Sequence, residues 1–473
     1  MTALPTCIGI IGAGNISSTY LEADRKFKNI YITKVADIDM NRAQAQAEKH
    51  DKQAATVDEL LADPEITIVV NLTVPAAHAP VALQALEAGK HVYNEKPLAT
   101  TREDAQRMLA LAKSKGLRIG GAPDTFLGGG LQTCRRLLDE GAIGQPVIAF
   151  ARMLSCGMES WHPNPEFFFK PGGGPMFDMG PYYLTALVTL LGPARRVSGM
   201  TRITHPERTI TSQPLYGKKI IVETPTLVSG LIEFDNGTIA NIVTTFDVAE
   251  GYDIGLTLYG TEGTLQCPDP NGFGGPVRLK RKGDPDWRDV GIQHKWVTNS
   301  RGLGVADMAA AIQEGRPHRA SAELTYHVLD LMHAFHDSAR KGRHVALEST
   351  CDRPRPPAPR LALTHPARAH DRSTRLCRRR PFLAAERRQA LARARLVAGI
   401  VGHTPRRSPP RLWPLSENNS PLSARPPFAF TSAPTSVTSY MWMAHASARG
   451  RSAARPTCGS TSRTSWRSMP AHT

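Results

Sequence analysis

A glycine-rich turn near the amino terminus has the residue types that a phosphate-binding site needs. Residues 12–17 read Gly-Ala-Gly-Asn-Ile-Ser, follow a short apolar run and match the GxGxxG pattern with serine in the last place. Gly12 permits a tight turn, and Gly14 lets the backbone come close to a pyrophosphate. Asn15 and Ile16 then open a helix, whose free N–H groups and positive dipole end would face the phosphates. The turn therefore predicts a dinucleotide site.

An acidic residue follows this turn at the distance that ribose recognition requires. Asp37 lies 23 residues after Gly14, at the end of a second apolar run. A carboxylate at this place can hold both hydroxyls of the adenosine ribose, which favours NAD. Arg42 is close enough to keep NADP open as the alternative cofactor.

The elements that must position the turn alternate regularly along the first quarter of the chain. Apolar runs predict strands at 8–11, 31–36, 66–72, 91–93 and 117–120, and helices are expected at 41–50, 58–62, 80–87 and 102–115. Strands and helices that alternate at this spacing are typical of a doubly wound parallel sheet. We assign residues 1–122 to an α/β, Rossmann-type NAD(P)-binding domain.

The pattern changes after this domain. Longer alternating runs predict strands at 147–153, 226–234, 238–246, 253–259 and 263–266, and helices are expected at 131–140, 182–191, 305–313 and 322–340. Asn236-Gly237 lies between two of the strands and is a strong hairpin signal. Residues 123–348 are therefore predicted to form an α+β domain with a mostly antiparallel open sheet.

The last part of the chain, residues 349–473, has an unusual composition. It contains 22 arginines, no lysine and four acidic residues, and it is rich in proline, serine and alanine. One interpretation is a disordered basic arm that binds nucleic acid or anionic lipid. We favour the other, a GC-rich gene read out of frame, because natural basic arms usually mix lysine with arginine.

Composition and charge exclude several classes of function. The net charge of +16 comes from the tail, since residues 1–348 carry about −2, so we expect neither a nucleic-acid nor a membrane partner. Seven scattered cysteines without a CxxC pair fit a reducing compartment, and we expect a cytoplasmic protein. Sixteen histidines without HxH or HExxH spacing give no reason to propose a metal.

Further motifs, in a fixed order, resemble those of the Gfo/Idh/MocA oxidoreductases, a family that includes glucose–fructose oxidoreductase and inositol dehydrogenase. The motifs are Thr73-Val74-Pro75 with His78, residues 88–92 (Ala-Gly-Lys-His-Val), Glu95-Lys96-Pro97, residues 139–144, residues 172–180 and residues 260–263. The resemblance covers about residues 5–348. It implies a dehydrogenase that transfers a hydride between NAD(P) and a hydroxyl or carbonyl carbon of a sugar, polyol or related compound.

The resemblance also assigns catalytic roles. Lys96 would remove the hydroxyl proton during oxidation and return it during reduction, with Asp178 binding a substrate hydroxyl and offsetting the lysine charge. Tyr182 stands where inositol dehydrogenase-like members have histidine, so it can donate or relay a proton, but Lys96 is the only plausible base. Asp178 and Tyr182 would share one helix face if the helix were continuous, which Pro181 makes uncertain.

The remaining site residues are implied more weakly. Thr73, Pro75, His78 and Glu95 would contact the cofactor, whereas Asp124 and His162 would face the substrate. His162 is equally consistent with a structural loop histidine. The family also implies a homodimer or homotetramer, and a catalytically silent NAD(P)-binding sensor on the same scaffold is the alternative function.

Overall fold

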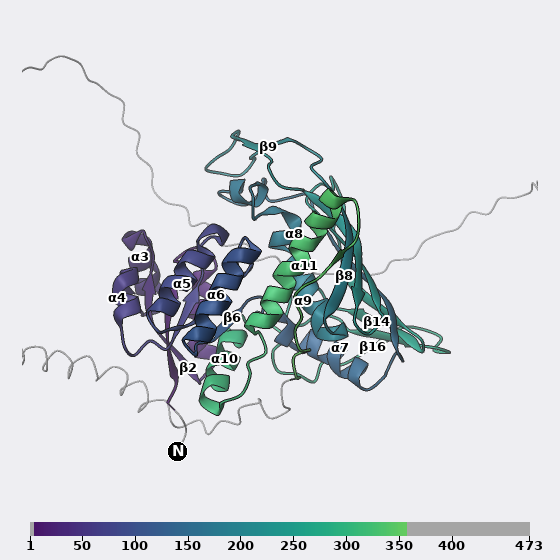
Figure 1. Cartoon of the computed structure of the whole chain (residues 1–473), viewed down its shortest axis with the longest axis horizontal. Coiled ribbons are helices and arrows are strands. Elements are labelled where there is room, and N and C mark those ends of the chain that lie inside the picture. Colours follow the sequence, from purple (N-terminus) through teal and green to yellow (C-terminus); the bar gives the residue numbers. More distant parts are fainter. Residues whose placement is uncertain (1–3, 357–473) are drawn as a thin grey trace, which may run out of the picture. The chain divides into compact units, whose positions relative to one another are not determined.

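The first sheet of the protein is six-stranded and wholly parallel (Figure 1). We describe residues 4–356 from a computed structural model. The sheet order is β3-β2-β1-β4-β5-β6, with β1 (Thr6–Ile11), β2 (Ile30–Ala36), β3 (Gln53–Ala55), β4 (Ile68–Asn71), β5 (His91–Asn94) and β6 (Ile119–Gly121). The predicted doubly wound sheet is confirmed, and the short β3 is an addition that the sequence pattern did not indicate.

Helices connect these strands by crossovers that run outward in two directions from the middle of the sheet. They are α1 (Ser17–Leu21), α2 (Ala23–Lys26), α3 (Met40–His50), α4 (Val57–Ala62), α5 (His78–Glu87) and α6 (Arg102–Ser114), with a 3₁₀ turn η1 (Pro75–Ala77). Because such crossovers are right-handed, α3 lies on one face of the sheet, and α5 and α6 lie on the other. The order reverses between β1 and β4, and ligands of such sheets bind at the carboxyl ends of the strands at that point.

The second sheet has nine strands in the order β16-β15-β14-β13-β7-β12-β11-β8-β17. They are β7 (Pro146–Leu154), β8 (Ala194–Arg202), β11 (Leu227–Phe234), β12 (Ile239–Thr245), β13 (Asp253–Gly260), β14 (Gly263–Cys267), β15 (Arg278–Arg281), β16 (Arg288–Asp289) and β17 (Val345–Ala346). Only the β7–β12 pair is parallel, so the prediction of a mostly antiparallel sheet is confirmed. Gly237, with φ of 83°, lies in the turn of the predicted β11–β12 hairpin. A separate hairpin of β9 (Glu207–Thr209) and β10 (Lys219–Ile221) was not predicted.

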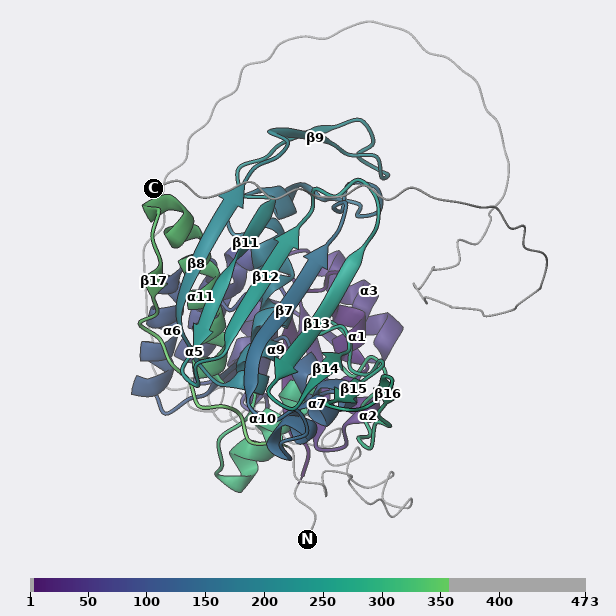
Figure 2. The ribbon, with the colours of Figure 1, turned by 90° about the vertical axis from the view of Figure 1, so that its right-hand side faces the viewer.

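Helices cover only one face of this second sheet. They are α7 (Gly129–Asp139), α8 (Gly174–Asp178), α9 (Gly180–Leu191) and α11 (Ala322–Lys341), while α10 (Leu303–Glu314) packs near β6. Every residue of α9 is buried, as its apolar sequence predicts. Figure 2 shows strands β8, β11, β12, β7 and β13 with no helix in front of them.

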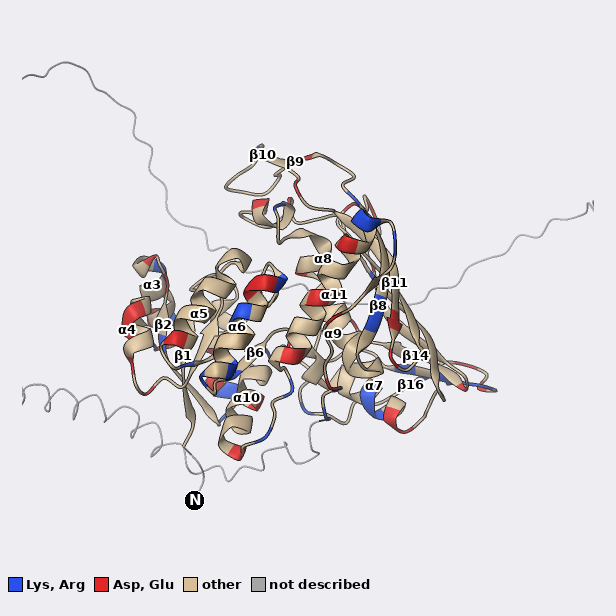
Figure 3. Cartoon of the chain, in the orientation of Figure 1, with Lys and Arg blue, Asp and Glu red and all other residues tan. Residues whose placement is uncertain are grey.

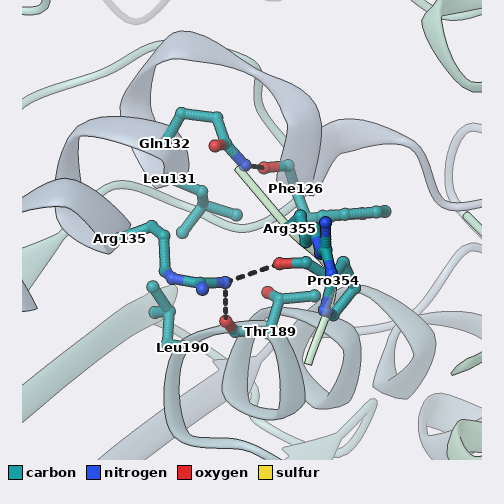
Figure 4. Close-up of a pocket in the computed structure, with 8 residues that line it drawn as sticks. All are labelled: Phe126, Leu131, Gln132, Arg135, Thr189, Leu190, Pro354 and Arg355. Atoms are coloured by element: carbon teal, nitrogen blue, oxygen red, sulfur yellow. Dashed lines mark hydrogen bonds between the residues drawn. The ribbon is translucent and has the colours of Figure 1, made fainter. Parts of the chain in front are cut away.

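The second domain extends past the boundary that composition placed at residue 348. Arg353 donates hydrogen bonds to the carbonyls of Thr189 (3.0 Å) and Leu190 (2.6 Å), and Cys351 is buried. Arg135 of α7 donates to the carbonyls of Thr189 and Pro354, so the segment is tied to both α7 and α9 (Figure 4). Residues 349–356 thus belong to the domain, and the predicted tail from 357 onward lies outside the described residues.

Charged side chains of both signs are distributed over both domains of the described part (Figure 3). This distribution agrees with the near-neutral charge of the first 348 residues. No helix within residues 4–356 has the length and hydropathy to cross a membrane.

Candidate active site

The glycine turn lies at the carboxyl end of β1, at the reversal point of the first sheet. Gly12 has φ of 107°, and a Cβ there would come within 2.6 Å of the Leu72 backbone, so only glycine fits. A Cβ on Gly14 would meet nothing within 4 Å, which leaves open space beside the backbone for a pyrophosphate. Ser17, in the last place of the pattern, is fully buried and donates through its hydroxyl to the Gly14 carbonyl (2.6 Å).

The helix that opens after the turn is shorter than the fingerprint implies. Ile16 is the N-cap of α1, whose five residues end before a second short helix, α2. A helix therefore begins next to Asn15, as predicted, but it is short and is interrupted at Glu22 before α2 begins.

Asp37 lies beside this turn, at the end of β2. Its Oδ2 accepts a hydrogen bond from the Ala13 N–H (2.7 Å) and its Oδ1 accepts one from the Asp39 N–H (2.9 Å). Each carboxylate oxygen has further lone pairs for ribose hydroxyls. Ile38 is fully exposed next to it, which gives this edge an apolar surface for a base. These features fit the adenosine half of NAD.

A buried pair of asparagines shapes the loops after β4 and β5. Asn71 Nδ2 donates to Asn94 Oδ1 (3.1 Å), and Asn71 Oδ1 accepts from both the N–H and the hydroxyl of Thr73. Asn94 Nδ2 donates to the Leu98 carbonyl (3.0 Å) and so holds the loop that carries Lys96. The two loops, including Pro75 at the start of η1, are thereby fixed at one edge of the sheet.

His78 has a different place from the one we predicted. It is 1% exposed, with Nδ1 2.6 Å from the Pro97 carbonyl and Nε2 3.0 Å from the Thr73 carbonyl. Burial lowers the pKa of His78, so the ring is neutral and donates to one of the two carbonyls. His78 therefore links the loop after β4 to the loop after β5. Because its side chain is buried, it does not have the exposed surface that the predicted cofactor contact requires.

Lys96 and Asp178, predicted from distant parts of the chain, meet in an ion pair. Lys96 Nζ lies 2.6 Å from Asp178 Oδ1 and 2.8 Å from the Asp178 carbonyl, and both side chains are largely buried. The Lys96–Pro97 peptide bond is cis. Glu95 fixes the approach of Lys96, because its Oε2 accepts from the Lys96 N–H (3.0 Å) and its Oε1 accepts from the Tyr20 hydroxyl (2.8 Å).

Tyr182 also reaches Lys96, though not through a continuous helix. The helix is interrupted at Met179, which ends α8 and precedes α9, so Asp178 and Tyr182 do not share a regular helix face. Lys96 Nζ nevertheless lies 5.3 Å from the centroid of the Tyr182 ring. Pro181 lies in the first turn of α9, where a missing N–H costs no helical hydrogen bond.

The charges around Lys96 determine its protonation. Burial by itself lowers the pKa of Lys96, but Asp178, Tyr182 and Glu95 outweigh burial and raise that pKa above the usual value of lysine. The ammonium form is therefore the stable one in this structure. The ammonium can donate a proton, and the Asp178 carboxylate holds it in place.

The structure places the two predicted substrate residues, His162 and Asp124, in different surroundings. His162 lies close enough to Asp178 for its pKa to respond to that charge, although burial lowers the pKa overall, and its ring packs against Trp161 and Phe167. Asp124 is 1% exposed, and its Oδ2 accepts from the N–H groups of Gly302 and Gly304 (2.9 Å each). Burial raises the pKa of Asp124 to about 6. Asp124 thus caps the start of α10, and we withdraw its assignment to the substrate.

One site residue escaped the sequence analysis. Burial lowers the pKa of Arg301, just before α10, but the nearby Tyr182, Asp124 and Glu95 outweigh burial and raise it. Its guanidinium also donates to Asn271 Oδ1 (2.9 Å). No motif surrounds this arginine, so only the fold brings it to the site.

A metal has no evident place in the part of the chain that the structure describes. Residues 4–356 contain no group of three or more His, Cys, Asp or Glu side chains arranged to hold an ion. The donor set around Lys96 is one of proton donors and acceptors, next to a turn suited to a dinucleotide.

Comparison with protein families gives two adjoining matches. Residues 7–121 match the sequence model described as the oxidoreductase family, NAD-binding Rossmann fold, of the GFO/IDH/MocA group. Residues 131–266 match the C-terminal domain of the same group. The two matches together span more than half of the chain.

Individual proteins agree with these matches. The chain is 27% identical over 370 residues to D-glucoside 3-dehydrogenase of Escherichia coli. This match covers 73% of this chain and 99% of that protein. It is 28% identical over 265 residues to 1,5-anhydro-D-fructose reductase of Ensifer adhaerens, covering 54% and 74% respectively. The solved structure of levoglucosan dehydrogenase in complex with NADH and levoglucosan shares the fold, with a TM-score of 0.63 and 22% identity. The match covers 72% of this chain and 99% of that one.

Proposed function

Since the chain belongs to the Gfo/Idh/MocA family of NAD-binding oxidoreductases, we propose that it transfers a hydride between NAD and a hydroxyl-bearing carbon of a sugar or polyol. The observation that carries the proposal is the 2.6 Å ion pair of Lys96 and Asp178 beside the loops of the nucleotide edge. The substrate class is supported by the relatives, whose names refer to a glucoside and an anhydrofructose.

The residues of the nucleotide edge would hold NAD. Gly12 and Gly14 would face its pyrophosphate, Asp37 its adenosine ribose, and Thr73 with Pro75 the half that carries the nicotinamide. When bound, the nicotinamide accepts or returns the hydride. Asp37 favours NAD over NADP, since a carboxylate repels a ribose 2′-phosphate.

Lys96 would manage the proton at the reacting oxygen. In the reductive direction its ammonium donates to the substrate carbonyl, the form that Asp178 stabilises. In the oxidative direction a substrate hydroxyl would donate a hydrogen bond to Asp178 and weaken the ion pair, so that the Lys96 ammonium could release a proton to solvent. The neutral amine would then accept the proton of the reacting hydroxyl. Asp178 therefore has two successive partners. A silent sensor would need no such set of contacts.

His162 would extend the substrate site. It lies within the electrostatic reach of Asp178, and the neighbouring Trp161 is 60% exposed. An exposed aromatic surface next to polar groups suits the apolar face of a sugar ring. We place His162 and Trp161 at the substrate entrance.

We also propose that the open face of the second sheet pairs with a second copy of the chain. Met200, Leu231 and Ile239 are 79%, 46% and 44% exposed on strands β8, β11 and β12, which form the uncovered face in Figure 2. Exposed apolar side chains gathered on one face of a sheet are typical of a protein–protein interface. Light scattering of the purified protein should give at least twice the mass of one chain, and Leu231→Glu should give a monomer. A wild-type monomer at micromolar concentration would contradict this proposal.

The cysteines of the described part are consistent with a cytoplasmic location. Cys134, Cys156, Cys267 and Cys351 form no disulfide. This absence fits a reducing compartment. Fractionation of the native host would test the location directly.

A substrate panel tests the activity itself. Sugars, glycosides and inositols would be incubated with the protein and NAD or NADP, and the absorbance of the reduced cofactor would be followed. We expect turnover with NAD for at least one member. Nicotinamide reduction by none of them, in a protein that binds NAD, would favour the silent sensor.

A further inference from the structure

Tyr20 of α1 forms a hydrogen bond with a residue 75 positions further along the chain. Its hydroxyl donates to Glu95 Oε1 (2.8 Å), and the tyrosine is 1% exposed. Burial and the charge of Glu95 raise the pKa of Tyr20 well above the usual value, so the hydroxyl keeps its proton. A hydrogen bond from a phenol to a carboxylate is charge-assisted, and it is stronger than one between neutral groups.

Glu95 transmits this contact to Lys96. Its second carboxylate oxygen, Oε2, accepts from the backbone N–H of Lys96 (3.0 Å), while its own N–H donates to the Asn71 carbonyl (2.9 Å). One side chain thus holds α1 with one oxygen and the backbone that carries Lys96 with the other. The path of that backbone determines where Lys96 Nζ meets Asp178.

The other end of α1 is anchored at the dinucleotide turn. Ser17, its first residue, donates to the Gly14 carbonyl through both its N–H (3.1 Å) and its hydroxyl (2.6 Å). A helix of five residues is too short to be stable by itself, so the contacts at its two ends determine its position. The turn that would face the pyrophosphate and the loop that carries Lys96 are therefore attached to opposite ends of one short helix.

We propose that Tyr20 is a positioning residue that couples the dinucleotide turn to Lys96. The inference rests on the proposed function and adds a connection to it. A nucleotide that binds the turn would restrict the motion of α1, and Tyr20 would then hold Glu95 and the Lys96 backbone in the arrangement that the structure shows. By linkage, a contact that is favoured when the nucleotide is bound also favours nucleotide binding.

Amide hydrogen exchange of the full chain tests the coupling without any substrate. The Lys96 N–H is the donor to Glu95, so its exchange rate reports how often this contact opens. ADP is the probe, because it has the pyrophosphate and the adenosine ribose but no nicotinamide that could cover Lys96. We expect saturating ADP to slow exchange of the Lys96 amide about fivefold or more in the wild type.

Two substitutions should remove this effect of ADP. Tyr20→Phe deletes the donor, and Glu95→Gln leaves one acceptor oxygen where the carboxylate uses two. In both variants ADP should change the exchange of the Lys96 amide by less than about twofold. No slowing by ADP in the wild type, or equal slowing in Tyr20→Phe, would overturn the proposal.

Tyr93→Phe is the matched control. Tyr93 is a buried tyrosine on β5, the strand that leads to Lys96, and its hydroxyl has no hydrogen-bond partner within residues 4–356. Tyr93→Phe should therefore show the same effect of ADP as the wild type and the same kcat. Loss of the ADP effect in this variant would mean that any change in local packing removes it, and the role of Tyr20 would be refuted.

Turnover provides a second, separate test. Tyr20→Phe should lower kcat about tenfold, as expected for loss of a hydrogen bond to a charged group. In a Glu95→Gln background the same substitution should change kcat by less than about twofold, and independent, multiplying effects would overturn the proposal. If the wild type oxidises no member of the panel, the proposed function fails, and the exchange experiment with ADP still decides the coupling.

Discussion

Replacing Asp178 with asparagine should shift the pH dependence of oxidation toward lower pH. The Lys96 Nζ–Asp178 Oδ1 distance is 2.6 Å. At an effective dielectric constant of about 20, two unit charges at this distance attract each other by about 6 kcal/mol, before the cost of removing them from water. Measured effects of a nearby opposite charge are smaller, about one to three pH units, which corresponds to about 1.4–4 kcal/mol.

The sign follows from the role of Lys96 as the base. Asp178 raises the pKa of Lys96, so the ammonium persists to high pH and oxidation by the wild type increases only as the pH rises. Asp178→Asn removes that carboxylate, lowers the pKa of Lys96 and moves the rise in kcat/KM to lower pH by about one to three units. Loss of a substrate contact would lower the rate at every pH, but it would not move this rise.

The assay is the initial rate of cofactor reduction over a series of buffers from neutral to alkaline pH. Asp337→Asn is the matched control, because Asp337 also pairs with a cation, Arg102, but lies outside the site. Its profile should coincide with that of the wild type. A rise that stays in place in Asp178→Asn, or moves to higher pH, would refute our account of the Lys96 charge.

Three further predictions concern the cofactor and the fold. Asp37→Ala should weaken NAD binding about tenfold and reduce the preference for NAD over NADP, which calorimetric titration with both cofactors would measure; an unchanged preference would argue against the ribose contact. Gly12→Ala should lower both the melting temperature and NAD affinity, because a Cβ there would lie 2.6 Å from the Leu72 backbone. Gly14→Ala has open space around the new Cβ, so it should lower NAD affinity without lowering the melting temperature. A chain that ends after Pro356 should have the same melting temperature as the full chain. A chain that ends after Glu348 loses the contacts of Arg353 and Cys351, so its unfolding free energy should fall by about 2–4 kcal/mol. Equal stability of the two truncated chains would show that residues 349–356 contribute nothing to stability.

The first domain was the part that the sequence predicted best. Its strands are short buried runs that end at glycine or at a motif residue, so the apolar pattern and the residues that end each strand predict the same boundaries. The order of the motifs then pointed to Lys96 and Asp178. The short strand β3 could not be predicted, since Gln53–Ala55 has no apolar run and becomes a strand only by pairing with β2.

Roles that depend on burial were harder to predict. His78 and Asp124 are polar residues in or near motifs, which favoured a ligand contact, yet their polar atoms are used by backbone groups of adjoining segments. Arg301 is the opposite case, because no motif surrounds it and only the fold brings its charge within electrostatic reach of Tyr182. The partners of Asp124 and Arg301 are far away in the sequence, and one carbonyl that contacts His78 belongs to Pro97, 19 residues away. No local sequence pattern predicts these contacts.

The central claim, that Lys96 moves the proton during NAD-dependent hydride transfer, is tested most directly by comparing Lys96→Ala with the wild type in turnover and in NAD affinity. We predict that kcat falls by about a hundred- to ten-thousandfold with the best substrate of the panel, while the Kd for NAD stays within about threefold. Turnover of Lys96→Ala at the wild-type rate, with the same substrate and cofactor, would contradict the account.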